Sequence, residues 1–232
     1  RHEAWENVSR TLAHEIKNPL TPIQLSIDRL KDKYSGKLKD EKIEFESYLK
    51  TINRQIKTIE NLVNEFSDFA RMPSPILKKI KIDDVLNRAI TFYKMSNEEL
   101  NLKLHKKINS NFYIKGDAEH LYRVFLNLIK NSIEAIDEKK QKNSNFKGKI
   151  TLEMNTNNEY IVIEMLDNGI GFKDVINITK PYFTTKKDGT GLGLPIVTKI
   201  INEHNGEIKF LKNPNGAEIH IYLPSYTWRT KY

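Results

Sequence analysis

The chain has 232 residues, with 38 Lys and Arg against 30 Asp and Glu, so its formal net charge is +8. This length suffices for one large or two small domains with a real hydrophobic core, without stabilising disulfides or metals. The absence of cysteine excludes a disulfide scaffold, a Cys-ligated metal site and thiol catalysis. The basic residues are mostly Lys and are spread along the chain. Because nucleic-acid binding needs clustered charge and a recognisable motif, we do not expect a nucleic-acid partner.

The first 70 residues predict two long helices. In the first, apolar residues step alternately by three and four positions, which is the pattern of a heptad seam. These positions are Ala13, Ile16, Leu20, Ile23, Ile27, Leu30 and Tyr34. Residues 34–37 form a turn signal, and a second seam follows at Phe45, Leu49, Ile52, Ile56, Ile59, Val63, Phe66 and Ala70. We therefore expect an all-α antiparallel hairpin. Since a hairpin cannot cover both of its apolar stripes, a second copy should complete a dimeric four-helix bundle.

Pro73 and Pro75 end the second helix, because proline lacks an amide hydrogen and clashes in a helix interior. We place the domain boundary there. Residues 1–72 form the hairpin domain, 73–76 a linker, 77–224 a second domain and 225–232 a tail of unknown role.

The second domain mixes strands and helices. Strands are expected over 77–82, 101–108, 112–114, 150–155, 160–166, 207–211 and 217–223. Asp83 should cap a helix to about Met95, Asp117 should cap a long helix, and residues 192–205 form a third. A Gly-rich, irregular segment covers 167–189. This mixture predicts an α+β two-layer sandwich, with the sheet on one side and the helices on the other.

Two of the four motifs in this domain carry polar side chains. Asn127 and Asn131 are four residues apart and share one helix face. Their amide oxygens suit Mg²⁺, which keeps most of its waters and binds substrate phosphates. The alternative is that both side chains are ordinary solvated surface residues. Asp167, Gly169 and Gly171 follow an apolar strand. A carboxylate at a strand end can accept a hydrogen bond from an exocyclic amine, and glycines let the backbone approach a ligand. The same residues also form a common turn signal.

The other two motifs are a glycine-rich helix start and a loop before it. Residues 189–194, Gly-Thr-Gly-Leu-Gly-Leu, offer free amide hydrogens and a positive dipole end to a phosphate. They match neither the P-loop nor the dinucleotide fingerprint. The loop over 181–186 carries an aromatic ring, two hydroxyls and a cation, as loops that cover nucleotides often do.

The order and spacing of the four motifs resemble the ATP-binding fold of the GHKL superfamily, which includes gyrase, Hsp90, histidine kinases and MutL. Residues 13–22, Ala-His-Glu-Ile-Lys-Asn-Pro-Leu-Thr-Pro, resemble the H-box of bacterial sensor histidine kinases. The resemblance covers essentially the whole chain. The sequences of the H-box and of residues 191–197 are most similar to those of the nitrogen-regulation (NtrY/NtrB-like) group.

This resemblance implies that His14 is autophosphorylated with the γ-phosphate of ATP. The phosphoryl group then passes to an Asp on the receiver domain of a separate response regulator, for which the kinase also acts as a phosphatase. Asn131 would hold Mg²⁺, Asp167 would bind adenine, and Phe183 would pack against the His domain. The full set of implied ATP-binding residues is Asn127, Lys130, Asn131, Asp167, Gly169, Gly171, Phe183, Thr184, Thr185, Lys186, Gly189, Thr190, Gly191, Leu192, Gly193 and Leu194.

The neighbours of His14 fit this role. His14 takes heptad position b, beside the seam and facing solvent. Glu15 can orient the imidazole and accept its proton as general base. Asn18 lies one turn on, on the same face, and is suited to position a water for the phosphatase reaction. Pro19 and Pro22 are expected to kink the helix.

Two other interpretations compete. One is a GHKL ATPase or chaperone-like clamp, but ATP-hydrolysing members carry a Glu where this chain has Asn127, so we expect little hydrolysis. The other is a degenerate kinase kept as a dimeric scaffold. We interpret the chain, which begins at Arg1 without an initiator Met, as the cytoplasmic fragment of an inner-membrane-anchored bacterial sensor, with no direct membrane contact of its own.

Overall fold

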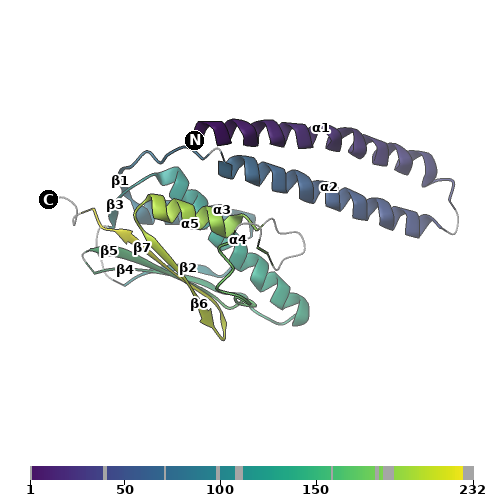
Figure 1. The fold of residues 1–232 in the computed structure, drawn as a ribbon. Coiled ribbons are helices and arrows are strands. Elements are labelled where there is room, and N and C mark those ends of the chain that lie inside the picture. The colour runs from purple at the N-terminus through teal and green to yellow at the C-terminus, as the bar shows by residue number, and fades with distance from the viewer. Residues whose placement is uncertain are drawn as a thin grey trace. The chain divides into compact units, whose positions relative to one another are not determined.

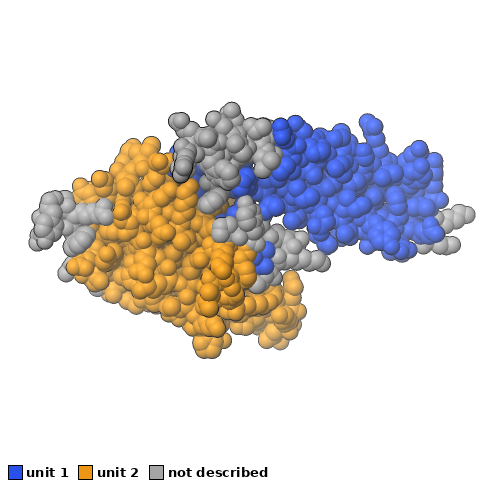
Figure 2. All heavy atoms as spheres, in the orientation of Figure 1, with its two compact units in different colours: residues 1–73, 184–192 blue, residues 74–183, 193–232 orange. Residues whose placement is uncertain are grey.

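The computed structural model describes residues 2–38, 41–70, 72–97, 100–107, 112–157, 159–180, 183–184 and 191–226, with the side chains of 2–12, 14 and 68–70 left out. The chain divides into two compact units, drawn in different colours in Figure 2. One comprises residues 1–73 and 184–192, and the other comprises residues 74–183 and 193–232. Within the described ranges, no helix is both long and apolar enough to cross a membrane.

The first unit contains the predicted hairpin, in which α1 (His2–Tyr34) and α2 (Lys42–Ala70) run side by side (Figure 1). Seam positions seven residues apart are buried in both helices: Ala13, Leu20 and Ile27 in α1, and Leu49, Ile56 and Val63 in α2. Leu20, Ile27, Leu49 and Ile56 form one hydrophobic cluster, with Ile16 and Phe45 packed against it. A hydrogen bond of 2.9 Å from Gln24 Nε2 to Asn53 Oδ1 also joins the two helices. The seven-residue repeat of buried positions is the coiled-coil pattern that the sequence predicted.

Four of the alternate seam positions stay exposed in the single chain. Ile23 and Leu30 of α1 are 45% and 43% exposed, and Ile52 and Ile59 of α2 are 44% and 41% exposed. One hairpin therefore buries one apolar stripe of each helix and leaves a second one uncovered.

The second unit is an α+β two-layer sandwich, as predicted. Its elements are β1 (Lys78–Lys81), α3 (Ile82–Ser96), β2 (Leu102–Lys106), β3 (Tyr113–Gly116), α4 (Ala118–Lys142), β4 (Ile150–Thr156), β5 (Tyr160–Asp167), α5 (Gly193–Glu203), β6 (Glu207–Asn213) and β7 (Gly216–Pro224). The main sheet has the strand order β2-β4-β5-β7-β6 and is antiparallel except for the β2–β4 pair. A small antiparallel sheet joins β1 to β3. Helices α3, α4 and α5 cover one face of the main sheet (Figure 1).

The core lies between this sheet and the helices. Along β5, alternate residues from Ile161 to Asp167 are buried, which is the period of a strand with one face in the core. The buried stripe of α4 faces them from the helix layer. It consists of Leu121, Val124, Phe125, Leu128, Ile129, Ser132 and Ile136. Ser132 is the one polar member of this stripe.

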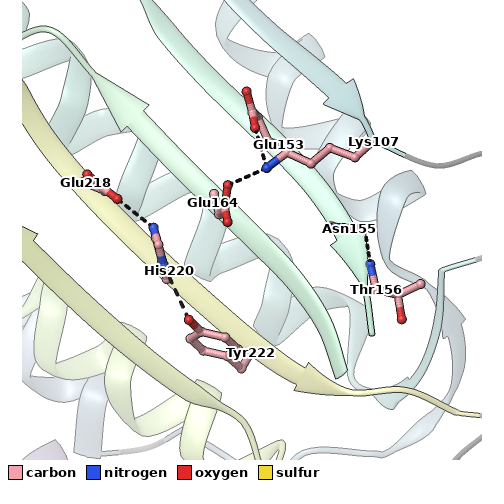
Figure 3. Close-up of polar contacts among 8 residues, drawn as sticks. All are labelled: Lys107, Glu153, Asn155, Thr156, Glu164, Glu218, His220 and Tyr222. Carbon is pink, nitrogen blue, oxygen red and sulfur yellow. Dashed lines mark hydrogen bonds and ion pairs between the residues drawn. The ribbon is translucent and has the colours of Figure 1, made fainter. Parts of the chain in front are cut away.

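The other face of the sheet carries polar side chains, seen in Figure 3. Glu153 and Glu164 are cross-strand neighbours on β4 and β5, and Lys107 pairs with both, at 2.9 Å and 3.0 Å. Hydrogen bonds to these two carboxylates raise the pKa of Lys107. Along β7, His220 Nε2 lies 2.9 Å from Glu218 Oε1. Because like charges opposite each other destabilise a sheet, the lysine offsets the Glu153–Glu164 repulsion.

The expected cap at Asp83 is wrong. Helix α3 begins at Ile82, directly after β1, and its N-cap position is Lys81, which makes no side-chain capping hydrogen bond. Asp83 lies in the first turn, where its buried carboxylate forms ion pairs with Lys81 and Lys106. The carboxylate therefore stabilises the helix through these lysines and the helix dipole. The third helix also ends earlier than expected, at Glu203, because Asn205 takes a left-handed conformation with φ 55°.

The predicted cap at Asp117 is confirmed and has a buried partner. Asp117 Oδ1 accepts hydrogen bonds from the amides of Glu119 and His120, and Oδ2 accepts one from the amide of Ile76. His204 Nε2 lies 2.9 Å from the amide nitrogen of Asp117, and Nδ1 lies 2.7 Å from the carbonyl oxygen of Ile200. The partners fix the tautomer: Nε2 accepts and Nδ1–H donates, so the imidazole is neutral.

We predict that His204 makes the stability of this unit pH-dependent. Burial lowers the pKa of His204 below its ordinary value. An unfolded histidine has a pKa of about 6.5, so its stabilising effect is complete above that pH and is lost as the pH falls through the folded pKa. His204→Gln keeps an acceptor for the Asp117 amide but does not titrate. It should cost on the order of 1 kcal/mol at pH 7 and lose less stability between pH 7 and pH 5.

Urea unfolding followed by circular dichroism at several pH values measures this difference. His105→Gln is the matched control, because His105 is exposed on β2. An equal loss of stability in His204→Gln and in the unsubstituted chain would contradict the assignment.

Asp117 affects stability in a lower pH range. Burial works to raise its pKa, but backbone hydrogen bonds, first that of Ile76, lower it overall, so its effect is lost only below about pH 3.9.

Candidate functional site

The Asp167 carboxylate at the end of β5 is the fixed point of the candidate site. It is buried, with 8% of its surface exposed. Oδ2 accepts a hydrogen bond of 2.6 Å from the Ser132 hydroxyl of α4. Oδ1 accepts hydrogen bonds from the amides of Gly169 and Ala217, at 2.9 Å and 3.2 Å. A carboxylate has about four acceptor positions. With three filled by described residues, one position on Oδ2 remains for a donor such as an exocyclic amine.

The glycines after Asp167 pack backbone against backbone. A Cβ atom on Gly169 would lie 2.8 Å from the backbone and Cβ of Ala135 in α4. Gly171 has φ +71°, and a Cβ atom there would lie 2.7 Å from the carbonyl oxygen of Gly216. A Cβ atom on Gly216 would lie 2.0 Å from the carbonyl oxygen of Asp167. No side chain fits at these positions, so the turn lies tightly between α4 and the β6–β7 turn.

Asn168 fastens the same turn to the segment before β4. Its Oδ1 accepts a hydrogen bond of 2.7 Å from the amide of Lys149, and its Nδ2 donates one of 2.9 Å to the carbonyl of Lys147. Ile170 donates its amide to the carbonyl oxygen of Ala135 at 3.3 Å. The turn is therefore held from three sides, by α4, by the start of β7 and by the segment preceding β4.

The paired amide side chains lie on α4, shortly before Ser132 in the sequence. Asn127 and Asn131 are both half-buried. Asn127 Nδ2 donates a hydrogen bond of 3.0 Å to the carbonyl oxygen of Arg123, and Asn127 Oδ1 lies 3.4 Å from the position of a Cβ atom on Gly193. Lys130 is exposed, with its Nζ 3.9 Å from Glu134. Asn127 thus brings the middle of α4 against the start of α5.

Helix α5 begins within the glycine-rich motif, as predicted. Gly193 is the first residue of the helix, and its first turn holds no acidic side chain. Gly191 has φ +70°, in the left-handed region, while Leu192 is fully buried and Leu194 half-buried. A helix N-terminus without acidic residues suits an anion such as a phosphate.

The loop between the glycine motifs is described only in part. Phe183 is half-buried, and its amide donates a hydrogen bond of 3.1 Å to the carbonyl of Lys180. Thr184 is exposed. Four expected site residues, Thr185, Lys186, Gly189 and Thr190, lie outside the described residues.

The H-box lies on α1. Ala13 is buried like Leu20 and Ile27, each seven residues further on, so position 14 follows the buried seam directly. The side chain of His14 lies outside the described residues, whereas those of Glu15 and Asn18 are exposed. Helix α1 continues through Pro19 and Pro22 to Tyr34.

Sequence reasoning missed three residues of the site: Ser132, Gly216 and Lys139. Ser132 had a readable signal, because it is a polar residue in an apolar helical stripe and so needs a buried partner. Gly216 is the first residue of β7, and its contact with Asp167 depends on the strand register. Lys139 donates hydrogen bonds to the carbonyl oxygens of Asn168 and Gly169, which no local pattern indicates.

The donor set suits a metal that is held mainly by substrate. Among the described residues, no group of three His, Cys, Asp or Glu side chains is placed to hold a metal ion. Asn131 would provide one neutral amide oxygen. This fits Mg²⁺, which binds proteins through one or two ligands and takes the rest from waters and phosphates.

Both parts of the chain match known domain families. Residues 4–75 match the His Kinase A (phospho-acceptor) domain. Residues 116–227 match the Histidine kinase-, DNA gyrase B-, and HSP90-like ATPase family.

Curated relatives match along nearly the whole chain. The nitrogen regulation protein NtrY of Azorhizobium caulinodans is 36% identical over 225 residues, which cover 96% of this chain and 29% of that protein. A putative NtrY-like sensor histidine kinase of Rickettsia bellii is 36% identical over 218 residues, 93% of this chain and 34% of that protein. The chain therefore spans about a third of the length of these relatives.

Solved structures share the fold. The histidine kinase ThkA, solved in complex with the response regulator protein TrrA, matches with a TM-score of 0.65 and 21% identity, over 96% of this chain and 62% of ThkA. Full-length ShkA in complex with AMPPNP matches with a TM-score of 0.64 and 21% identity, over 95% of this chain and 46% of ShkA. With a phospho-acceptor hairpin followed by a kinase-type ATPase domain, the chain belongs to the sensor histidine kinases.

Proposed function

We propose that this chain autophosphorylates His14 with the γ-phosphate of ATP. The Asp167 carboxylate carries the proposal, because the acceptor position on Oδ2 that the described residues leave open suits the 6-amino group of adenine. The tightly packed glycine turn holds this carboxylate in place, and the start of α5 suits the phosphates. Further support comes from the two matched domain families. The domain boundaries at 1–72, 73–76, 77–224 and 225–232 belong to the same proposal.

We assign the phosphate-binding role to residues of α4 and to Lys186, in the segment between β5 and α5. Asn127, Lys130 and Lys186 would lie near the phosphates, and Asn131 would hold Mg²⁺. The metal, when bound, neutralises phosphate charge and helps to align the transferred group. Positioning and charge neutralisation supply most of the catalysis in phosphoryl transfer. These residues therefore act by binding and orienting the nucleotide.

Two residues would favour transfer of the γ-phosphate to His14 rather than to water. Glu15 would accept the imidazole proton, leaving the other ring nitrogen of His14 free to attack. An amide cannot act as a base for water, so Asn127 favours transfer to His14 over ATP hydrolysis.

We further propose a homodimer formed through the hairpin and a response regulator as the phosphoryl acceptor. The exposed half of each heptad seam supports the dimer, because it needs an apolar cover. ThkA, a structural neighbour, was solved with a response regulator. The likeness to a nitrogen regulation protein supports a role in nitrogen regulation. A place on the cytoplasmic side of a membrane-anchored sensor is part of the same proposal.

Autophosphorylation can be tested directly with radiolabelled ATP and Mg²⁺. We predict a label on the chain that is stable to alkali and labile to acid, and that is lost in His14→Gln. His105→Gln is the matched control and should keep the label. A label of the same chemistry and extent on His14→Gln would contradict the proposal. An unlabelled chain that binds ATP would indicate the dimeric scaffold, and rapid ATP turnover by His14→Gln would indicate the ATPase.

The dimer can be tested on the exposed seam of α2. Ile52→Lys places a charge in the proposed interface, where desolvation without a partner costs several kcal/mol. We predict a dimer mass for the unsubstituted chain in sedimentation equilibrium and a monomer mass for Ile52→Lys. Thr51→Lys, at the neighbouring exposed position, should remain dimeric. A monomeric unsubstituted chain, or a dimeric Ile52→Lys, would argue against this interface.

The phosphatase role rests on Asn18, which is exposed one turn from His14. We predict that Asn18→Ala slows dephosphorylation of the phosphorylated receiver domain by about 10²-fold, the cost of losing a positioned reactant, while autophosphorylation remains. Lys17→Ala, at an adjacent exposed position, serves as control. Unchanged dephosphorylation by Asn18→Ala would remove this residue from the proposal.

A further inference from the structure

The ammonium group of Lys139 joins α4 to both turns that surround Asp167. Its Nζ donates hydrogen bonds to the carbonyl oxygens of Asn168 and Gly169, at 2.6 Å and 2.9 Å. It also donates one to the carbonyl oxygen of Asn215, in the β6–β7 turn, at 3.4 Å. Because an ammonium group has three donors, all of them are used in this arrangement.

The bonded carbonyls belong to the segments that hold the Asp167 carboxylate. The carbonyl of Asn168 and the amide of Gly169 form one peptide unit, and that amide donates to Asp167 Oδ1. Asn215 lies two residues before Ala217, whose amide also donates to Oδ1. A cation at the oxygen end of a peptide unit polarises it and strengthens the hydrogen bond at its N–H end. Lys139 thus polarises the Gly169 amide directly, and it restrains the turn that leads to the Ala217 amide.

Neighbouring lysines of α4 take no such part. Lys140 lies 3.8 Å from Asp137, and Lys142 lies 3.7 Å from Glu138, which are local helix pairs. The Lys139 ammonium also lies 4.8 Å from the ring centre of Phe146, so a cation–π contact restrains its position. A general preference for basic residues in the last turn of a helix explains Lys140 and Lys142, but not the three carbonyls around Lys139.

We propose that Lys139 is a positioning residue for recognition of the nucleobase. It holds the turn at 168–169 and the β6–β7 turn in place, so that Asp167 Oδ2 faces the exocyclic amine of the base. The inference deepens the proposed function and rests on it. Lys139 does not touch the nucleotide and acts through Asp167.

Comparison of two nucleotides separates a loss of base recognition from a general loss of nucleotide binding. Binding of ATP and of purine riboside triphosphate, which lacks the 6-amino group, is measured by calorimetry on the full chain. For Lys139→Met we expect the dissociation constant of ATP to rise about tenfold, equivalent to about 1.4 kcal/mol, with that of the analogue unchanged. The preference for ATP over the analogue should therefore fall about tenfold.

Two variants complete the set. Lys140→Met, the adjacent lysine, should keep the preference of the unsubstituted chain, and Lys139→Arg should restore part of it, because guanidinium also donates to carbonyls. Equal weakening of both nucleotides in Lys139→Met, or an unchanged preference, would overturn the proposal.

Amide hydrogen exchange at Gly169 and Ala217 separates this inference from the proposed function. If the unsubstituted chain bound neither nucleotide, the proposed function would fail, and the nucleobase role of Lys139 with it. Exchange would still report whether Lys139 restrains the turns. Faster exchange in Lys139→Met than in Lys140→Met is the expected result, and equal exchange would overturn the restraint itself.

Discussion

A buried carboxylate is the constraint on which this site depends. Asp167 ends the strand β5 inside the core, where an unpaired carboxylate would be costly. Donors from different parts of the fold therefore converge on it: the Ser132 hydroxyl from α4, the Gly169 amide from the turn and the Ala217 amide from β7. Each of these donors fills one acceptor position of the carboxylate, and together they fix its orientation. The position left on Oδ2 is thus set by the fold rather than by a flexible side chain.

Helix α4 connects this carboxylate to the rest of the site. Its apolar stripe packs on the sheet, and its N-terminus is tied to α5 through Asp117 and His204. The same helix presents Asn127 towards the start of α5 and Lys139 towards the turn at 168–169. One rigid element therefore sets the spacing between the proposed base-binding and phosphate-binding ends, as precise sites require.

Features with a local cause could be predicted from the sequence. The heptad seams gave the hairpin, because side-chain period follows directly from helix geometry, and Asp117 was predicted as a cap for the same kind of local reason. Asp83 shows the limit. Its position fits a cap, but β1 runs directly into α3, and Lys81 and Lys106 attract the carboxylate instead. The sequence does not show that Lys106 of β2 lies beside α3.

The residues around Asp167 illustrate the same distinction. The Asp-x-Gly-x-Gly pattern is local, and it predicted both a turn and a ligand site. Gly216 and Lys139 meet that turn only because β7 pairs with β5 and α4 crosses the sheet at this end. Contacts of this kind depend on register over 30 to 50 residues, for which a single sequence offers no periodic signal.

The most direct test of the account is the affinity of Asp167→Asn for ATP, measured by calorimetry on the full chain with Asp137→Asn as control. Asp137 is exposed on α4 and pairs with Lys140. An amide at position 167 cannot serve all these donors, and a hydrogen bond to a charged partner contributes about 1.5–3 kcal/mol. The account predicts that ATP affinity falls by at least about tenfold in Asp167→Asn alone. Equal ATP affinity in the two variants would contradict it.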